Sequence, residues 1–143
     1  MNQNQAKISI RSLIDSIPDR DFCIDCTGLA GSEKAYLVSR VYREHKTPVV
    51  VIVPSQKDAE LYLEDLQYFM GSLSPHVVYF PSYNISPFKN LSYHNKTAAK
   101  RISTLYRLID SDAPQILVTT ARALLEKIIP KQEICDFAEL IVA

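Results

Sequence analysis

Apolar residues recur along the chain in two alternating patterns, short continuous runs and helical stripes. The continuous runs, each typical of a strand, are FCIDCTG (22–28), PVVVIVP (48–54), HVVYFP (76–81), QILVTT (115–120) and FAELIVA (137–143). PVVVIVP consists almost entirely of β-branched residues, which predicts a parallel strand buried on both faces.

Helical stripes separate these runs. After a first amphipathic stretch, Ile8 to Ile17, three helices are predicted by apolar positions spaced three or four residues apart: Leu37, Val38, Val41 and Tyr42; Ala59, Tyr62, Leu63, Leu66, Phe69 and Met70; Ala98, Ile102, Leu105, Tyr106 and Ile109. A fourth helix is expected at ARALLEKII (121–129). Capping residues agree with this pattern, because Ser55 with Asp58 forms a capping box, Gly71 and Pro130 end helices, and Thr120 begins one.

Alternation of strands and helices predicts an α/β fold, a parallel sheet with helices on both faces and hence three layers. The 143 residues suit one domain of ordinary size. No internal repeat or low-complexity segment interrupts them.

Charge and composition limit which binding partners and which cellular compartment we expect for the protein. Sixteen basic residues balance 16 acidic ones, so no overall field attracts nucleic acid or a membrane, and any such contact needs a local patch. The start of the chain, MNQNQAKISIRSLIDS, lacks the apolar core of a signal peptide, and no apolar run reaches membrane-spanning length. We therefore expect a soluble, cytoplasmic protein without membrane contact.

The three cysteines are expected to be buried and structural. Cys23 and Cys26 form a C-x-x-C pair within a strand-like run, where residues three apart point to opposite faces. A redox pair would instead open a helix, and a zinc site needs a second pair, whereas only Cys135 remains. We expect no metal site.

The stretch GLAGSEKA (28–35) is close to the phosphate-binding pattern G-x-x-x-x-G-K-[ST]. Its position between an apolar run and a helix is correct, and Lys34 occupies the lysine position. Glu33, however, stands where the second glycine belongs, and Ala35 where the magnesium-binding hydroxyl belongs. Phosphoryl transfer depends on that metal and on close positioning, so we expect no catalytic residues here and no nucleotide hydrolysis.

The ordered blocks GLAGSEKAYLVSRVYREHKTPVVVIVPSQKDAELYLEDLQYFMG, VVYFPSYNISPF, SYHNKTAAKRISTLYRLI and ILVTTARALLEKIIP carry a more specific signal. Together they resemble the amino-terminal region of the bacterial transcription-repair coupling factors (Mfd), from about residue 20 to residue 130. That region is similar in turn to the first domain of the excision-repair helicase UvrB. The glycine loop, with Gly28, Gly31, Ser32 and Lys34, fits the degenerate form of the coupling factors.

This resemblance implies a fold of the P-loop NTPase or RecA-like type. Residues 1–130 would be the UvrB-like domain 1a, and residues 131–143 would begin the following UvrA-binding domain. The chain itself would need no cofactor, whereas the parent protein would use ATP and magnesium as a DNA translocase that displaces stalled RNA polymerase. UvrA would bind through the adjoining domain, and RNA polymerase and DNA through the rest of the parent.

A small basic and aromatic cluster is the candidate DNA contact. It comprises Lys89, Tyr93, Lys96, Lys100 and Arg101, near Phe88 and His94. A solvated helix start with aromatic residues packed on the sheet is the alternative interpretation. The segment 81–96 is long for a loop of a compact domain, and such loops are often functional.

A rival hypothesis makes the chain the amino-terminal half of an active helicase motor. VVVIVPSQKDAELYLEDL and ILVTTARALLEK also resemble early helicase motifs, and ELIVA (139–143) would be the strand leading into an acidic box. Ala35 opposes this, because the motor needs the missing hydroxyl. The scattered His45, His76 and His94 give no sign of a hydrolase triad.

Overall fold

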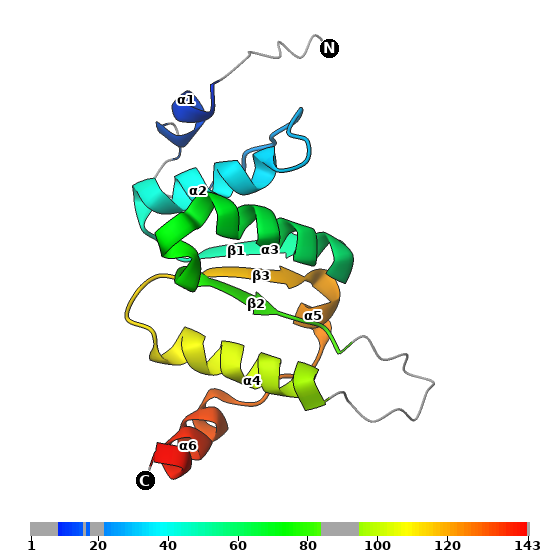
Figure 1. Cartoon of the computed structure of the whole chain (residues 1–143), viewed down its shortest axis with the longest axis vertical. Coiled ribbons are helices and arrows are strands. Elements are labelled where there is room, and N and C mark those ends of the chain that lie inside the picture. The colour runs from blue at the N-terminus through cyan, green and yellow to red at the C-terminus, as the bar shows by residue number, and fades with distance from the viewer. Residues whose placement is uncertain (1–8, 16, 18–21, 84–94, 143) are drawn as a thin grey trace.

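The computed structural model describes residues 9–15, 17, 22–83 and 95–142 (Figure 1). Its helices and strands, in chain order, are α1 (Ile10–Asp15), α2 (Glu33–His45), β1 (Val49–Val53), α3 (Gln56–Met70), a short 3-10 helix (Gly71–His76), β2 (Val77–Phe80), α4 (Asn95–Asp110), β3 (Ile116–Thr120), α5 (Ala121–Leu125) and α6 (Lys131–Val142). The strand and helix alternation predicted from the sequence is therefore present from α2 to α5.

The sheet has three parallel strands in the order β1-β3-β2. In the register of β1 on β3, Val49 pairs with Ile116 and Val53 with Thr120. Since β3 comes last in the chain but lies in the middle, β1 and β2 are both edge strands among the described residues. A small parallel α/β architecture is thus confirmed.

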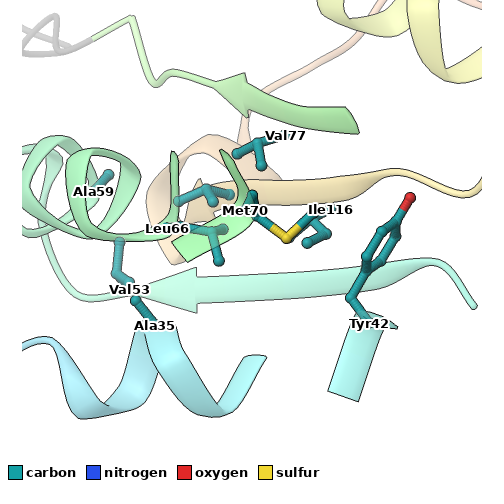
Figure 2. Close-up of a cluster of buried hydrophobic side chains, with 9 residues drawn as sticks. Ala35, Tyr42, Val53, Ala59, Leu66, Met70, Val77 and Ile116 are labelled. Atoms are coloured by element: carbon teal, nitrogen blue, oxygen red, sulfur yellow. The ribbon is translucent and has the colours of Figure 1, made fainter. Parts of the chain in front are cut away.

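One face of the sheet forms the main core. Helix α3 contacts all three strands, and α2 packs on α3 (Figure 1). Leu66 and Met70 of α3 lie over Ile116 and Val118 of β3, and all four side chains are fully buried. Figure 2 shows Ala35 of α2 beside Val53 at the end of β1. The alternation of side chains along the strands therefore directs one apolar set into this core.

On the opposite face, the described elements cover β2 but leave the side chains of β1 exposed. Helix α4 packs there, and Thr104 donates from its hydroxyl to the Tyr79 carbonyl at 2.8 Å. Along β1, in contrast, Val50 is 58% exposed and Ile52 is 56% exposed. The prediction that PVVVIVP is buried on both faces is therefore wrong for these two residues, because β1 is an edge strand and α4 does not reach it.

The helix caps predicted at Ser55, Gly71 and Thr120 are present. Ser55 accepts the Asp58 backbone N–H at 3.2 Å and donates to the Asp58 carboxylate at 2.6 Å. Gly71 ends α3 with φ of 54°, a left-handed conformation that favours glycine. Thr120 accepts the Ala123 N–H at 3.2 Å and so begins α5. Ser55, Gly71 and Thr120 thus each form a hydrogen bond with a terminal backbone group of a helix.

Three sequence predictions are corrected. Residues 22–27 of FCIDCTG form neither strand nor helix, and their side chains are exposed. FAELIVA is not a strand, because α6 extends over it as far as Val142. The helix ARALLEKII ends at Leu125 rather than near Pro130, and α6 begins at Lys131. The apolar residues of each segment predicted a strand or a longer helix. Among the described residues, however, no strand of the sheet pairs with residues 22–27 or with residues 137–142.

None of the helices that the structure describes is long and apolar enough to cross a membrane.

Candidate functional site

The glycine loop lies before α2, at the same end of the sheet as the carboxyl terminus of β1. Gly28 has φ of 87° and Gly31 has φ of 50°, values that a residue with a Cβ atom rarely adopts. A Cβ atom at either position would meet no other atom within 4 Å. The glycines are therefore required by backbone conformation rather than by crowding.

Glu33, the first residue of α2, bonds back to this loop. Its Oε2 atom accepts the Ala30 backbone N–H at 2.8 Å, and its own N–H donates to the Ala30 carbonyl at 3.1 Å. Backbone N–H groups before a helix are the donors that a phosphate loop offers to its anion. Here one of them is already taken by a side-chain carboxylate, which also brings negative charge to the place where phosphate would bind.

Ala35 faces the core rather than the loop. It is 0% exposed and belongs to the apolar cluster around Val53 and Ala59 (Figure 2). A hydroxyl at this position would be inside the protein, without water or metal. Position 35 is therefore unsuited to bind magnesium for two reasons. Its residue has no hydroxyl, and the start of α2 directs its side chain away from the loop.

Lys34 is exposed, and its backbone is tied to α3. The Tyr62 hydroxyl donates to the Lys34 carbonyl at 3.1 Å. Burial, with a smaller effect of Asp65, raises the pKa of Tyr62 to about 12. Ser32 precedes the helix without a side-chain capping bond. Of the predicted loop residues, Glu33 therefore bonds back to the loop and Lys34 is exposed beside it, whereas Ala35 faces the core.

The two cysteines before the loop are not buried. Cys23 and Cys26 are exposed, and Cys135 of α6 is half-buried. The prediction of buried structural cysteines is therefore wrong for the C-x-x-C pair, because its segment is not a strand. Among the described residues, no three His, Cys, Asp or Glu side chains lie close enough together to hold a metal ion.

Arg101, a predicted DNA contact, is instead the centre of a buried polar cluster at the carboxyl end of β2. It is 2% exposed, and its Nη1 atom donates to the Pro81 carbonyl at 2.7 Å and to Glu126 Oε2 at 2.8 Å. The guanidinium also stacks on the rings of Phe80 and Tyr83, at 4.1 and 4.3 Å from their centres. Its donors are used inside the protein, so we remove Arg101 from the candidate DNA contacts.

The other predicted DNA contacts divide into two groups. Lys96 and Lys100 are exposed and lie one turn apart near the start of α4, a helix with no acidic residue in its first turn. The amino-terminal end of a helix carries a partial positive charge, which disfavours nearby cations such as these two lysines and favours an anion. Lys89 and Tyr93 lie outside the described residues.

Glu126 was missed in the sequence analysis. Its carboxylate accepts the Tyr83 backbone N–H at 3.1 Å as well as the Arg101 guanidinium, and so joins three segments of the chain. Its partners are 25 and 43 residues distant in sequence. No local pattern marks it, and only a contact prediction would have found it.

The structure is thus a small parallel α/β domain in which a glycine-containing loop before α2 is hydrogen-bonded to the side chain of Glu33. No protein-family model matches the chain. The chain is similar to the transcription-repair-coupling factor of Myxococcus xanthus, with 25% identity over 107 residues, 72% of this chain and 9% of that protein. The corresponding factor of Rickettsia prowazekii is 28% identical over 97 residues (67% of this chain, 8% of that protein), and that of Escherichia coli 26% over 102 residues (71% and 8%).

These matches confirm the resemblance to transcription-repair-coupling factors that the sequence blocks indicated. The matched region covers only 8–9% of the length of these relatives. The likeness to UvrB and the division at residue 130 stay predictions.

Proposed function

We propose that this chain is a non-catalytic, UvrB-like module of a transcription-repair coupling factor. It acts in transcription-coupled nucleotide excision repair as part of the scaffold that recruits UvrA. Its sheet is the core of a three-layer, RecA-like domain, and residues 131–143 begin the adjoining domain that binds UvrA. The parent protein supplies the ATP- and magnesium-dependent translocation on DNA and the contact with RNA polymerase in the cytoplasm.

The non-catalytic assignment rests on the hydrogen bond that the Ala30 N–H donates to Glu33 Oε2. An anion entering the loop must displace this carboxylate and then remain beside it, which opposes binding by charge as well as by space. Burial of Ala35 supports the same conclusion, because no metal-binding hydroxyl faces the loop. The helicase-motor hypothesis is weakened further by α6, which is helical where that hypothesis expects a strand.

Phosphate release by the purified chain tests this proposal. We expect no magnesium-dependent ATP hydrolysis above the background of the buffer, and no difference between the wild type and Lys34→Ala. Titration calorimetry with ATP and magnesium should likewise show no saturable binding. Steady hydrolysis that Lys34→Ala abolishes would overturn the proposal and favour the motor hypothesis.

A further inference from the structure

The outward face of α3 carries two exposed apolar side chains. Leu61 is 54% exposed and Tyr68 is 81% exposed. They are seven residues apart, which is two helical turns, so they lie on one line of the helix about 10.5 Å long. Helix α3 lies in front of the sheet in Figure 1. Because both side chains are exposed, none of the described elements packs on this line, and it is open to a partner.

The ring of Tyr68 is held in place by its neighbours. It packs edge-on against Phe69, with 5.3 Å between the ring centres, and Phe69 packs in the same way against Tyr36 of α2, also at 5.3 Å. A ring fixed in this way loses little side-chain entropy when a partner covers it. Tyrosine is also among the residues that contribute most to binding at protein interfaces. Tyr68 is therefore an exposed aromatic ring that is already ordered for contact.

Negative charge surrounds this line of α3. The helix has one basic residue and four acidic residues, a net charge of −3, although the whole chain has no net charge. The acidic residues are Asp58, Glu60, Glu64 and Asp65. None of them forms an ion pair with another described residue. Such a face attracts a basic partner and repels DNA and anionic membranes.

The interior of the protein shows which group binds an aromatic ring beside a carboxylate. Arg101 stacks on two aromatic rings while it donates to Glu126. A guanidinium makes both contacts at once, because its flat face meets the ring and its edge carries the N–H donors. On α3, Glu64 and Tyr68 are four residues apart and hence neighbours on the helix surface. They offer the same two contacts, and no arginine of the described chain stacks on Tyr68.

We propose that the outward face of α3 docks a basic helical segment of a partner protein, and that one arginine of that segment stacks on Tyr68 and pairs with Glu64. Apolar residues of the same segment cover Leu61. A helix fits this face, because its own residues seven apart have the same spacing as Leu61 and Tyr68. The opposite charges of the two surfaces attract and orient the segment.

The probe is a fluorescein-labelled helical peptide of about 15 residues, the length of α3, with a leucine stripe flanked by arginines. The comparison peptide carries citrulline, which has the shape of arginine without its charge, at every arginine position. Fluorescence anisotropy with the full chain of 143 residues measures both affinities. We expect the citrulline peptide to bind at least about threefold more weakly, the combined effect of one exposed cation–π contact and one exposed ion pair.

Two variants test the two contacts separately. Glu64→Gln should weaken binding of the arginine peptide about two- to fivefold and leave the citrulline peptide unchanged. Tyr68→Ala should weaken the arginine peptide at least about twofold, and by more than it weakens the citrulline peptide. Glu44→Gln is the matched control for charge, since it removes one exposed carboxylate from α2. Leu125→Ala is the control for apolar surface, since it shortens an exposed side chain of α5. Neither control should alter binding.

Equal affinity for the two peptides, or equal effects of Glu64→Gln and Glu44→Gln, would overturn the proposal. So would the absence of binding by the arginine peptide at about 1 mM. A dimer of the chain in sedimentation that Tyr68→Ala dissociates would overturn it in favour of a second copy, and duplex DNA that displaces the peptide would overturn it in favour of nucleic acid. Both variants replace exposed side chains, so they should fold as the wild type does.

Discussion

Arg101 shows how one side chain can hold several segments. Its guanidinium joins the end of β2 through Pro81, the residue after α5 through Glu126, and two aromatic rings by stacking. A buried arginine is tolerated only when its charge and its donors are satisfied. The position is thus specific for arginine, because lysine lacks the planar group that bonds and stacks at once.

We predict that Arg101→Ala lowers the free energy of unfolding by about 3–5 kcal/mol, because it leaves the Glu126 carboxylate without its buried partner. Arg101→Lys should fall between this variant and the wild type. Urea denaturation followed by circular dichroism measures both. The control is Arg122→Ala, which removes a half-exposed cation 3.8 Å from the same Glu126 and should change stability by less than about 0.5 kcal/mol. Equal effects of Arg101→Ala and Arg122→Ala would show that the buried pair adds nothing.

Among the elements, the start of α2 decides the chemistry of the glycine loop. Glu33 faces the loop, whereas Ala35 faces Val53 and the core. The helix therefore presents a carboxylate where phosphate would bind and hides the position that would need a hydroxyl. Restoring the sequence consensus does not by itself restore this geometry.

We predict that Ala35→Thr lowers the free energy of unfolding by about 1–3 kcal/mol, because it adds atoms to a fully buried position. Even combined with Glu33→Gly, it should give no ATP hydrolysis. The same substitution at Ala99, an exposed position of α4, is the control and should lower stability by under about 1 kcal/mol, the difference in helix propensity. Chemical denaturation measures both. A fully stable Ala35→Thr variant would mean that α2 rotates to expose position 35.

Because the whole molecule has equal numbers of acidic and basic residues, any attraction for DNA must come from local clusters of basic residues. Lys96 and Lys100 form the described part of such a cluster at the start of α4. Because Arg101 is buried, the cluster can make fewer phosphate contacts than the sequence suggested. Binding that rests on so few cations is weak and depends on salt.

We predict sequence-independent DNA binding with a dissociation constant no tighter than about 10⁻⁴–10⁻⁶ M. Lys96→Ala with Lys100→Ala should weaken binding on every sequence alike. It should also reduce the slope of log K against log salt by up to about 1.8, that is, 0.9 for each of two phosphates. Fluorescence anisotropy at several salt concentrations measures this, with Lys57→Ala and Lys131→Ala, both exposed elsewhere, as the control pair. A preferred DNA sequence, or binding unchanged by the first pair, would contradict it.

The sequence alone determined the elements whose signals are local. Helix stripes, the caps at Ser55, Gly71 and Thr120, and the apolar runs of β1, β2 and β3 all act within a few residues, so their pattern predicts them. The same holds for the altered glycine loop, since Glu33 and Ala35 depart from a pattern of fixed spacing. The resemblance to transcription-repair-coupling factors could also be recognised from the ordered blocks.

Only the tertiary structure decided which surfaces these elements share. Val50 and Ile52 belong to a run that predicts burial, but strand order places them at an uncovered edge. Arg101 belongs to a basic cluster in sequence, but its partner Glu126 is brought to it by folding. Residues 22–27 have the composition of a strand but no described strand to pair with. Burial and pairing depend on neighbours distant in sequence, and those neighbours are fixed by packing rather than by any local pattern.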